Sequence, residues 1–338
     1  MFSFKSAIIF ATLSLAVLVP ASNAHANPSP VTILNVSYDP TRELYAALNP
    51  VFSAYWQKKT GQTVTINQSH GGSGAQARAV IEGLEADVVT LALAYDIDAI
   101  SKQTSLIPSN WQSRLPHNSS PYTSTIVFVV RKGNPKHIHD WNDVVKPGVG
   151  VIAANPKTSG GARWIFLGAW GYAQKRDHYN EAKTRDFIGA LYHNVVVLDT
   201  GSRGSTTSFA ERGLGDVLLG WENEAILLTR EHPGQYEIIT PSISILAEPT
   251  ISLVDGNARK HRTEAVSNAY LQWLYTPTAQ KIEADNGYRP TLASIYGKTH
   301  THFPAVNLLQ IDRDFGGWQT VQKKFFADGG VFDQIYHN

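Results

Sequence analysis

Four short segments of this 338-residue chain have the composition of an anion-binding site. Each is rich in small or polar residues and stands between an apolar and an amphipathic segment: YDPT at 38–41, GGSG at 71–74, TSGG at 158–161 and GSRGS at 201–205. The first N–H groups of a helix lack intrahelical partners and carry the positive end of the helix dipole, and glycine lets an anion approach the backbone. Four converging helix starts would form a cage of donors for a small anion.

Other chemistries fit these segments less well. A single Gly/Ser turn is weak evidence, because such residues are common in loops and helix caps. No turn completes the phosphate loop G-x-x-x-x-G-K-[S/T] and no carboxylate pair for magnesium stands nearby, which disfavours nucleotides. The H-x-H pairs at 137–139 and 300–302 have no third ligand at a helical spacing, so they are interpreted as surface histidines. We predict neither a metal nor a cofactor.

The elements that must position the turns alternate between strand and helix. In the first half, strands are predicted over 31–38, 63–67 and 87–94, with Asp39 as the N-cap and Pro40 as the first residue of the helix that follows the first strand. In the second half, the predicted strands are 121–131, 150–154, 194–198 and 216–219. This alternation predicts parallel sheets, whose strands end at one edge, where ligands bind in such folds.

The length of the chain favours two domains, because about 300 residues exceed what one hydrophobic core usually organises. Two long extended segments, 122–130 and 245–254, are able to cross between two lobes and form a hinge. The predicted division gives residues 27–120 and 247–338 to lobe 1 and residues 121–246 to lobe 2. The ligand cleft is expected between them.

The N-terminus has the layout of a cleavable export signal. Lys5 precedes an apolar run that ends at Pro20, and small residues follow. Residues 1–26 are therefore predicted to be a signal peptide cut after Ala26, with Ala24 as the competing site. The chain has no Cys, which excludes disulfides and thiol chemistry. Its net charge of +1 does not indicate a basic surface for binding nucleic acid.

Seven stretches carry a resemblance to a known family: LNVSYDPTRELY, QSHGGSGAQA, ADVVTLALAYD, NPKTSGGARW, GSRGST, GWENEA and ILAEPT. The chain resembles the sulfate-binding proteins of bacterial sulfate transporters over essentially its whole mature length. The resemblance implies a two-lobed α/β periplasmic binding protein of type II, each lobe a mainly parallel sheet flanked by helices. It also implies a periplasmic monomer without enzymatic activity that delivers sulfate to the permease subunits of an ABC transporter.

The same resemblance implies the groups that hold the anion. They are the backbone N–H groups of Asp39, Ser73, Gly160, Gly161 and Ser202, the hydroxyl of Ser159 and the indole of Trp221. Ser202 stands where the family pattern often has Ala. Supporting positions beside the turns are Arg163, Arg203 and His70. Without the resemblance, Trp221 would be interpreted as a core aromatic, Ser159 as a capping serine, and the two arginines equally well as members of ion pairs.

A cage made only of donors suits sulfate, which carries no proton at neutral pH. The O–H of hydrogen phosphate would remain unpaired there, at a cost of about 1–3 kcal/mol. Thiosulfate, selenate, molybdate or chromate remain alternatives within the same class. The rivals are a phosphate receptor and an exported enzyme acting on an anionic ester, although no G-x-S-x-G elbow surrounds Ser159 and no base or orienting acid is identifiable.

Overall fold

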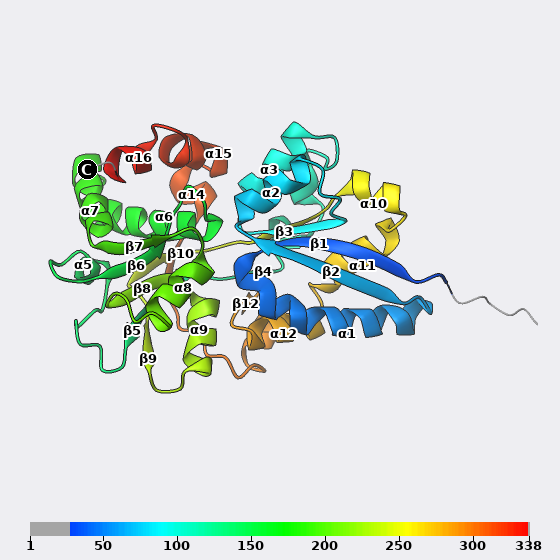
Figure 1. Cartoon of the computed structure of the whole chain (residues 1–338), viewed down its shortest axis with the longest axis horizontal. Coiled ribbons are helices and arrows are strands. Elements are labelled where there is room, and N and C mark those ends of the chain that lie inside the picture. Colours follow the sequence, from blue (N-terminus) through cyan, green and yellow to red (C-terminus); the bar gives the residue numbers. More distant parts are fainter. Residues whose placement is uncertain (1–27, 337–338) are drawn as a thin grey trace, which may run out of the picture.

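The computed structural model describes residues 28–336, which form two α/β lobes side by side (Figure 1). The predicted signal peptide and its cleavage sites lie outside these residues. The sheet of the first lobe has the order β11-β3-β1-β2, and β1 pairs in parallel with both β2 and β3. Its strands are β1 (Val31–Tyr38), β2 (Val64–Gly71), β3 (Val88–Leu91) and the antiparallel β11 (Thr250–Leu253).

Helices cover both faces of this sheet. The main ones are α1 (Arg42–Thr60), α2 (Ser73–Ile81), α3 (Ala94–Gln103), α10 (Asp255–His261), α11 (Glu264–Trp273) and α12 (Pro277–Asp285). Two short turns, η2 (Trp111–Ser113) and α4 (Pro116–Ser119), lead toward the hinge. The apolar residues of α1 recur every four positions at Leu44, Leu48, Phe52 and Trp56, and all are buried against the lobe core.

The second lobe is built on a five-stranded sheet of order β7-β6-β8-β5-β9. Its strands are β5 (Ile126–Arg131), β6 (Val151–Ala154), β7 (Val195–Asp199), β8 (Val217–Trp221) and β9 (Tyr236–Ile239). The helices are α5 (Trp141–Val144), α6 (Gly160–Arg176), α7 (Glu181–His193), α8 (Ser202–Ala210) and α9 (Glu222–Glu231). The sheet is mixed, because β6 pairs in parallel with β7 and β8 whereas β5 runs antiparallel to both of its neighbours.

The hinge consists of extended segments that lie side by side. The single strand predicted over 121–131 is divided into β4 (Tyr122–Thr123) and β5, and the break at Ser124 is where the chain passes between lobes. Ser124 and Ala247 form an antiparallel bridge in which each N–H donates to the other's carbonyl at 2.9 Å. Nearby, β12 (Arg289–Pro290) pairs with β4, and the chain crosses a third time after α13 (Ala293–Tyr296), a short helix that packs against α12 of the first lobe.

The C-terminal segment lies on the second lobe (Figure 1). It comprises β13 (Asn307–Leu309), which pairs in parallel with β10 (Ile243–Ile245), followed by α14 (Ile311–Phe315), α15 (Trp318–Val321), the π-helical turn η3 (Gln322–Phe326) and α16 (Val331–Tyr336). The division predicted from sequence gives residues 247–338 to the first lobe. The placement of 307–336 differs because Phe325 and Phe326 pack against the aromatic face of α6.

Within residues 28–336, no helix is both long and apolar enough to cross a membrane. The same residues contain no cluster of three or more His, Asp or Glu side chains arranged to hold a metal ion.

Candidate functional site

All four turns singled out in the sequence meet in one small cavity between the lobes. The first lobe contributes Tyr38, Asp39, Pro40, Gly71, Gly72 and Ser73, and the second contributes Ser159, Gly160, Gly161, Gly201 and Ser202. The cavity measures about 10 Å³ in this closed arrangement, which is room for about one water molecule, so a larger occupant requires its walls to move apart. The fold therefore offers a buried space for a small polar species.

Each turn presents backbone N–H groups at the start of a helix. Ser73 is the first residue of α2, Gly160 and Gly161 are the first two of α6, and Ser202 is the first of α8. Such groups have no acceptor within their own helix, and the positive ends of the helix dipoles meet at the cavity. The arrangement favours an anion without placing a formal positive charge against it.

The start of α1 differs from the prediction. Asp39 is the first residue of a 3₁₀ turn, η1 (Asp39–Thr41), whose N-cap is Tyr38, and the N-cap of α1 itself is Thr41, so the assignment of Asp39 as N-cap is wrong. The Asp39 carboxylate instead accepts a hydrogen bond from the Arg42 guanidinium at 3.2 Å. Its capping role is lost because the side chain turns toward this cation three residues on, while its N–H remains at the helix start.

The three serines at the cavity have different hydroxyl bonding. Ser73 Oγ donates to Asp96 Oδ2 at 2.5 Å and accepts from the Ala92 N–H at 3.0 Å, so its hydroxyl is engaged inside the lobe. Ser159 caps α6 by accepting from the Ala162 N–H at 3.3 Å, which leaves its own proton available as a donor. The Ser202 hydroxyl has no partner within residues 28–336.

Two glycines at the start of α6 have no space for a side chain. A Cβ on Gly161 would lie 2.9 Å from both Ser202 Oγ and Trp221 Nε1, inside the same lobe. A Cβ on Gly160 would instead meet the opposite lobe, 3.0 Å from the Cβ of Ser73. Glycine is therefore required at both positions. At 161 it lets the Ser202 hydroxyl and the Trp221 indole come close to the backbone, and at 160 it lets the two lobes come close to each other.

Trp221 lies beside the cavity and does not line it. The residue ends β8, is fully buried and packs its ring against Tyr38, with 5.6 Å between ring centroids. Its indole N–H donates to the carbonyl of Gly161 at 3.3 Å, a long hydrogen bond.

The three predicted supporting residues surround the cavity without lining it. Arg203 forms an ion pair with Glu43 of α1 at 2.8 Å, which joins the lobes. Arg163 donates through Nε to the Pro156 carbonyl at 3.0 Å, and burial lowers the pKa of its guanidinium against the opposing charge of Asp96. His70 is half-buried, and burial together with the nearby Arg42 lowers its pKa, which favours a neutral ring.

Two contacts near the site had no signal in the sequence, one within the first lobe and one between the lobes. Asp96 holds the Ser73 hydroxyl although the residues are 23 positions apart, and burial raises the pKa of its carboxyl in spite of the nearby Arg163. Trp164 of α6 donates its indole N–H to the Ala92 carbonyl of the first lobe at 3.1 Å. No local pattern marks either residue, because each acts on a partner brought close only by folding.

Two α/β lobes joined by crossing segments, with helix starts from both lobes around one small cavity, define a solute-binding protein that encloses a small anion. The comparison with known families agrees: residues 41–289 match the bacterial extracellular solute-binding proteins, and the chain belongs to this family.

Several named proteins are similar to the chain over nearly its whole length. A sulfate-binding protein from Salmonella typhimurium is 60% identical over 306 residues, which cover 90% of this chain and 93% of that protein. A thiosulfate-binding protein from Pseudomonas aeruginosa is 46% identical, covering 96% and 97%. Among solved structures, the sulfate-binding protein SubI from Mycobacterium tuberculosis superposes with a TM-score of 0.78 at 31% identity, covering 88% and 99%.

Proposed function

We propose that this chain captures sulfate between its lobes in the periplasm and delivers it to an ABC transporter for import. The observation that carries the proposal is the small cavity at which helix starts from both lobes converge. Similarity to sulfate-binding proteins at 57–60% identity supports the choice of anion. The relatives carry the names of binding proteins and not of enzymes, so we propose no turnover of an ester.

The proposed ligands are neutral hydrogen-bond donors. They are the backbone N–H groups of Asp39, Ser73, Gly160, Gly161 and Ser202, the Ser159 hydroxyl and the Trp221 indole. Hydrogen bonds to a charged group contribute about 1.5–3 kcal/mol each, so the set supplies on the order of 10–20 kcal/mol before dehydration and closure are subtracted. A micromolar or tighter complex, about 8 kcal/mol net, is within reach.

Selectivity over phosphate follows from the scarcity of acceptors at the cavity. Asp39 is the acidic residue among those that line it, and one of its carboxylate oxygens already accepts from Arg42. The proton of hydrogen phosphate would have no good acceptor, which costs about 1–3 kcal/mol. Sulfate carries no proton at neutral pH and meets no such penalty.

Thiosulfate is a second candidate ligand. It is also a dianion without a proton at neutral pH, and thiosulfate-binding relatives are 46–48% identical to this chain. The same donors would hold its three oxygens, while the larger terminal sulfur would have to fit beside the closely packed Gly160 and Gly161. We expect the tight packing to favour sulfate.

The route to the transporter includes three further proposals. The predicted signal peptide would direct the chain to the periplasm, where it would act as a monomer. Closure of the lobes would bring together the surfaces that the permease subunits contact, so that only the loaded receptor docks. The transporter would then accept the anion when the lobes reopen.

Calorimetric titration of the ligand-stripped mature protein tests the proposal. We expect one-to-one binding of sulfate, weaker binding of thiosulfate and none of phosphate at neutral pH. Sulfate affinity should stay nearly flat across neutral pH, since the anion does not titrate there. Tight phosphate binding whose affinity follows the protonation of phosphate would reject the donor-only site. Absence of binding for both sulfate and thiosulfate would reject the proposed ligand class.

A further inference from the structure

The turn at 155–159 sets where α6 begins and therefore where its donors point. Asn155 shapes this turn with two hydrogen bonds: its Oδ1 accepts from the Lys157 N–H at 2.9 Å and its carbonyl accepts from the Ser159 N–H at 2.8 Å. Thr158 contacts the neighbouring turn by donating through Oγ1 to the Thr200 carbonyl at 2.8 Å. These contacts hold the turn from within the second lobe.

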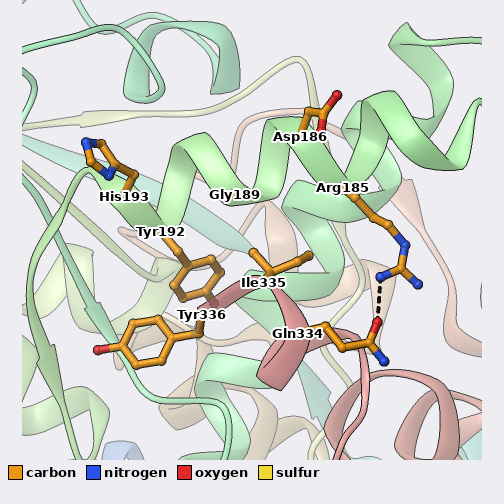
Figure 2. A pocket seen from close by; sticks show the side chains of 8 residues that line it. All are labelled: Arg185, Asp186, Gly189, Tyr192, His193, Gln334, Ile335 and Tyr336. Atoms are coloured by element: carbon orange, nitrogen blue, oxygen red, sulfur yellow. Dashed lines mark hydrogen bonds between the residues drawn. The ribbon is translucent and has the colours of Figure 1, made fainter. Parts of the chain in front are cut away.

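The C-terminal segment is fastened to the same lobe by contacts remote from the turn. Figure 2 shows α16 lying against α7, where Arg185 Nη1 donates to Gln334 Oε1 at 2.9 Å. Lys324 forms an ion pair with Glu181 of α7 at 3.0 Å. These polar contacts anchor the segment, but none of them reaches the cavity.

Lys157 connects the segment to the binding turn. Its ammonium lies 2.9 Å from the Asp333 carboxylate and 3.2 Å from both the Phe326 carbonyl and the Asp328 carboxylate. The Lys157 side chain is 28% exposed and that of Asp333 20%, so this pair is shielded better than an ordinary surface pair. Burial opposes the charge, but the two carboxylates prevail and raise the pKa of Lys157.

Arg163 makes a second connection between the C-terminal segment and this turn. Arg163 holds the Pro156 carbonyl through Nε at 3.0 Å, and its guanidinium lies over the Phe326 ring at 5.3 Å from the ring centroid. The C-terminal segment therefore contacts Lys157 directly and Pro156 only through Arg163 of α6. Ser159, two residues later, caps α6.

We propose that residues 318–336 brace the turn at 155–159 and thereby position the donors of Ser159, Gly160 and Gly161, with Lys157 as the positioning residue. The proposal rests on the proposed function, because it assigns a role in affinity to a segment that does not line the cavity. Preorganised donors bind an anion more tightly than donors that must be ordered during binding.

The test compares one substitution in the brace with one in the anchor. Lys157→Met removes the ammonium and keeps the aliphatic stem, Lys324→Met does the same at the Lys324–Glu181 pair, and Lys157→Arg keeps the charge. We expect Lys157→Met to weaken sulfate binding about fivefold, mainly through faster dissociation, with recovery in Lys157→Arg. Lys324→Met should bind sulfate like the wild type, although it should also lower the melting temperature.

Amide hydrogen exchange in the ligand-free protein tests the brace without any ligand. We expect residues 159–162 to exchange faster in Lys157→Met and at the wild-type rate in Lys324→Met. Wild-type exchange and affinity in Lys157→Met would overturn the brace, as would equal losses in both Met variants. If the wild-type protein fails to bind sulfate, the proposed function falls, and the exchange data still decide whether the segment positions the turn.

Discussion

Replacing Gly160 by Ala should penalise lobe closure while leaving each lobe intact. The new Cβ would lie 3.0 Å from the Cβ of Ser73, 3.2 Å from that of Ala92 and 3.3 Å from Leu93 Cγ, all in the opposite lobe. The backbone of Gly160 is not in the left-handed region, so alanine can adopt it without strain. The cost therefore falls on the closed state alone.

The magnitude follows from these contacts. Inserting one methyl group into a well-packed interface costs about 1–3 kcal/mol, because neighbouring groups must shift. This corresponds to a loss of sulfate affinity of about 5- to 150-fold. The free energy of unfolding without ligand should be unchanged when the lobes are apart, because the new methyl group then contacts no neighbour.

Titration calorimetry, small-angle scattering with and without sulfate, and thermal unfolding without ligand provide the assay. The matched control is Gly168→Ala in the same helix, whose Cβ would lie 3.4 Å from Trp141 and touch only the second lobe and the hinge. We expect the Gly160→Ala protein to compact less on adding sulfate. Wild-type affinity in Gly160→Ala would refute the reasoning, because the bound state would then not be this closed arrangement.

Three other predictions concern single side chains. Trp221→Phe and Ser159→Ala each remove one donor and should weaken sulfate binding about tenfold or more without unfolding the protein; unchanged titration curves in both would contradict the donor assignment. Arg203→Met breaks the interlobe pair with Glu43, whose side chains are 39% and 37% exposed, so calorimetry should show at most about a fivefold loss that shrinks in high salt. Burial raises the pKa of the Glu224 carboxyl from 4.5 to about 7, so its contribution to stability is complete below pH 4.5 and is lost as the pH rises through 7. The loss is on the order of 3 kcal/mol, and urea unfolding should show Glu224→Gln gaining stability over the wild type as the pH rises from 4.5 to 7, with a constant advantage above that range; equal pH profiles would exclude this role.

Local chemistry in the sequence accounts for much of the site. The four turns can be predicted because Gly, Ser and Pro favour turn conformations of their own backbone. The strand and helix patterns around them are also local, since each extends over only a few residues. Parallel strands then bring the turns to common sheet edges, as the structure shows for the residues around the cavity. The class of fold and the meeting of the four turns at one cavity were therefore predictable before any tertiary contact was known.

Tertiary structure decided which groups hold the turns and which lobe each segment joins. Glu43 and Arg203 are 160 residues apart, and Lys157 and Asp333 are 176 apart, so no periodicity or spacing relates them. The same holds for the C-terminal segment, whose aromatic residues fit the α6 face of the second lobe although the preceding strand β12 pairs at the hinge. Local sequence fixes backbone conformation over a few residues, whereas the partners of a side chain depend on packing across the whole chain.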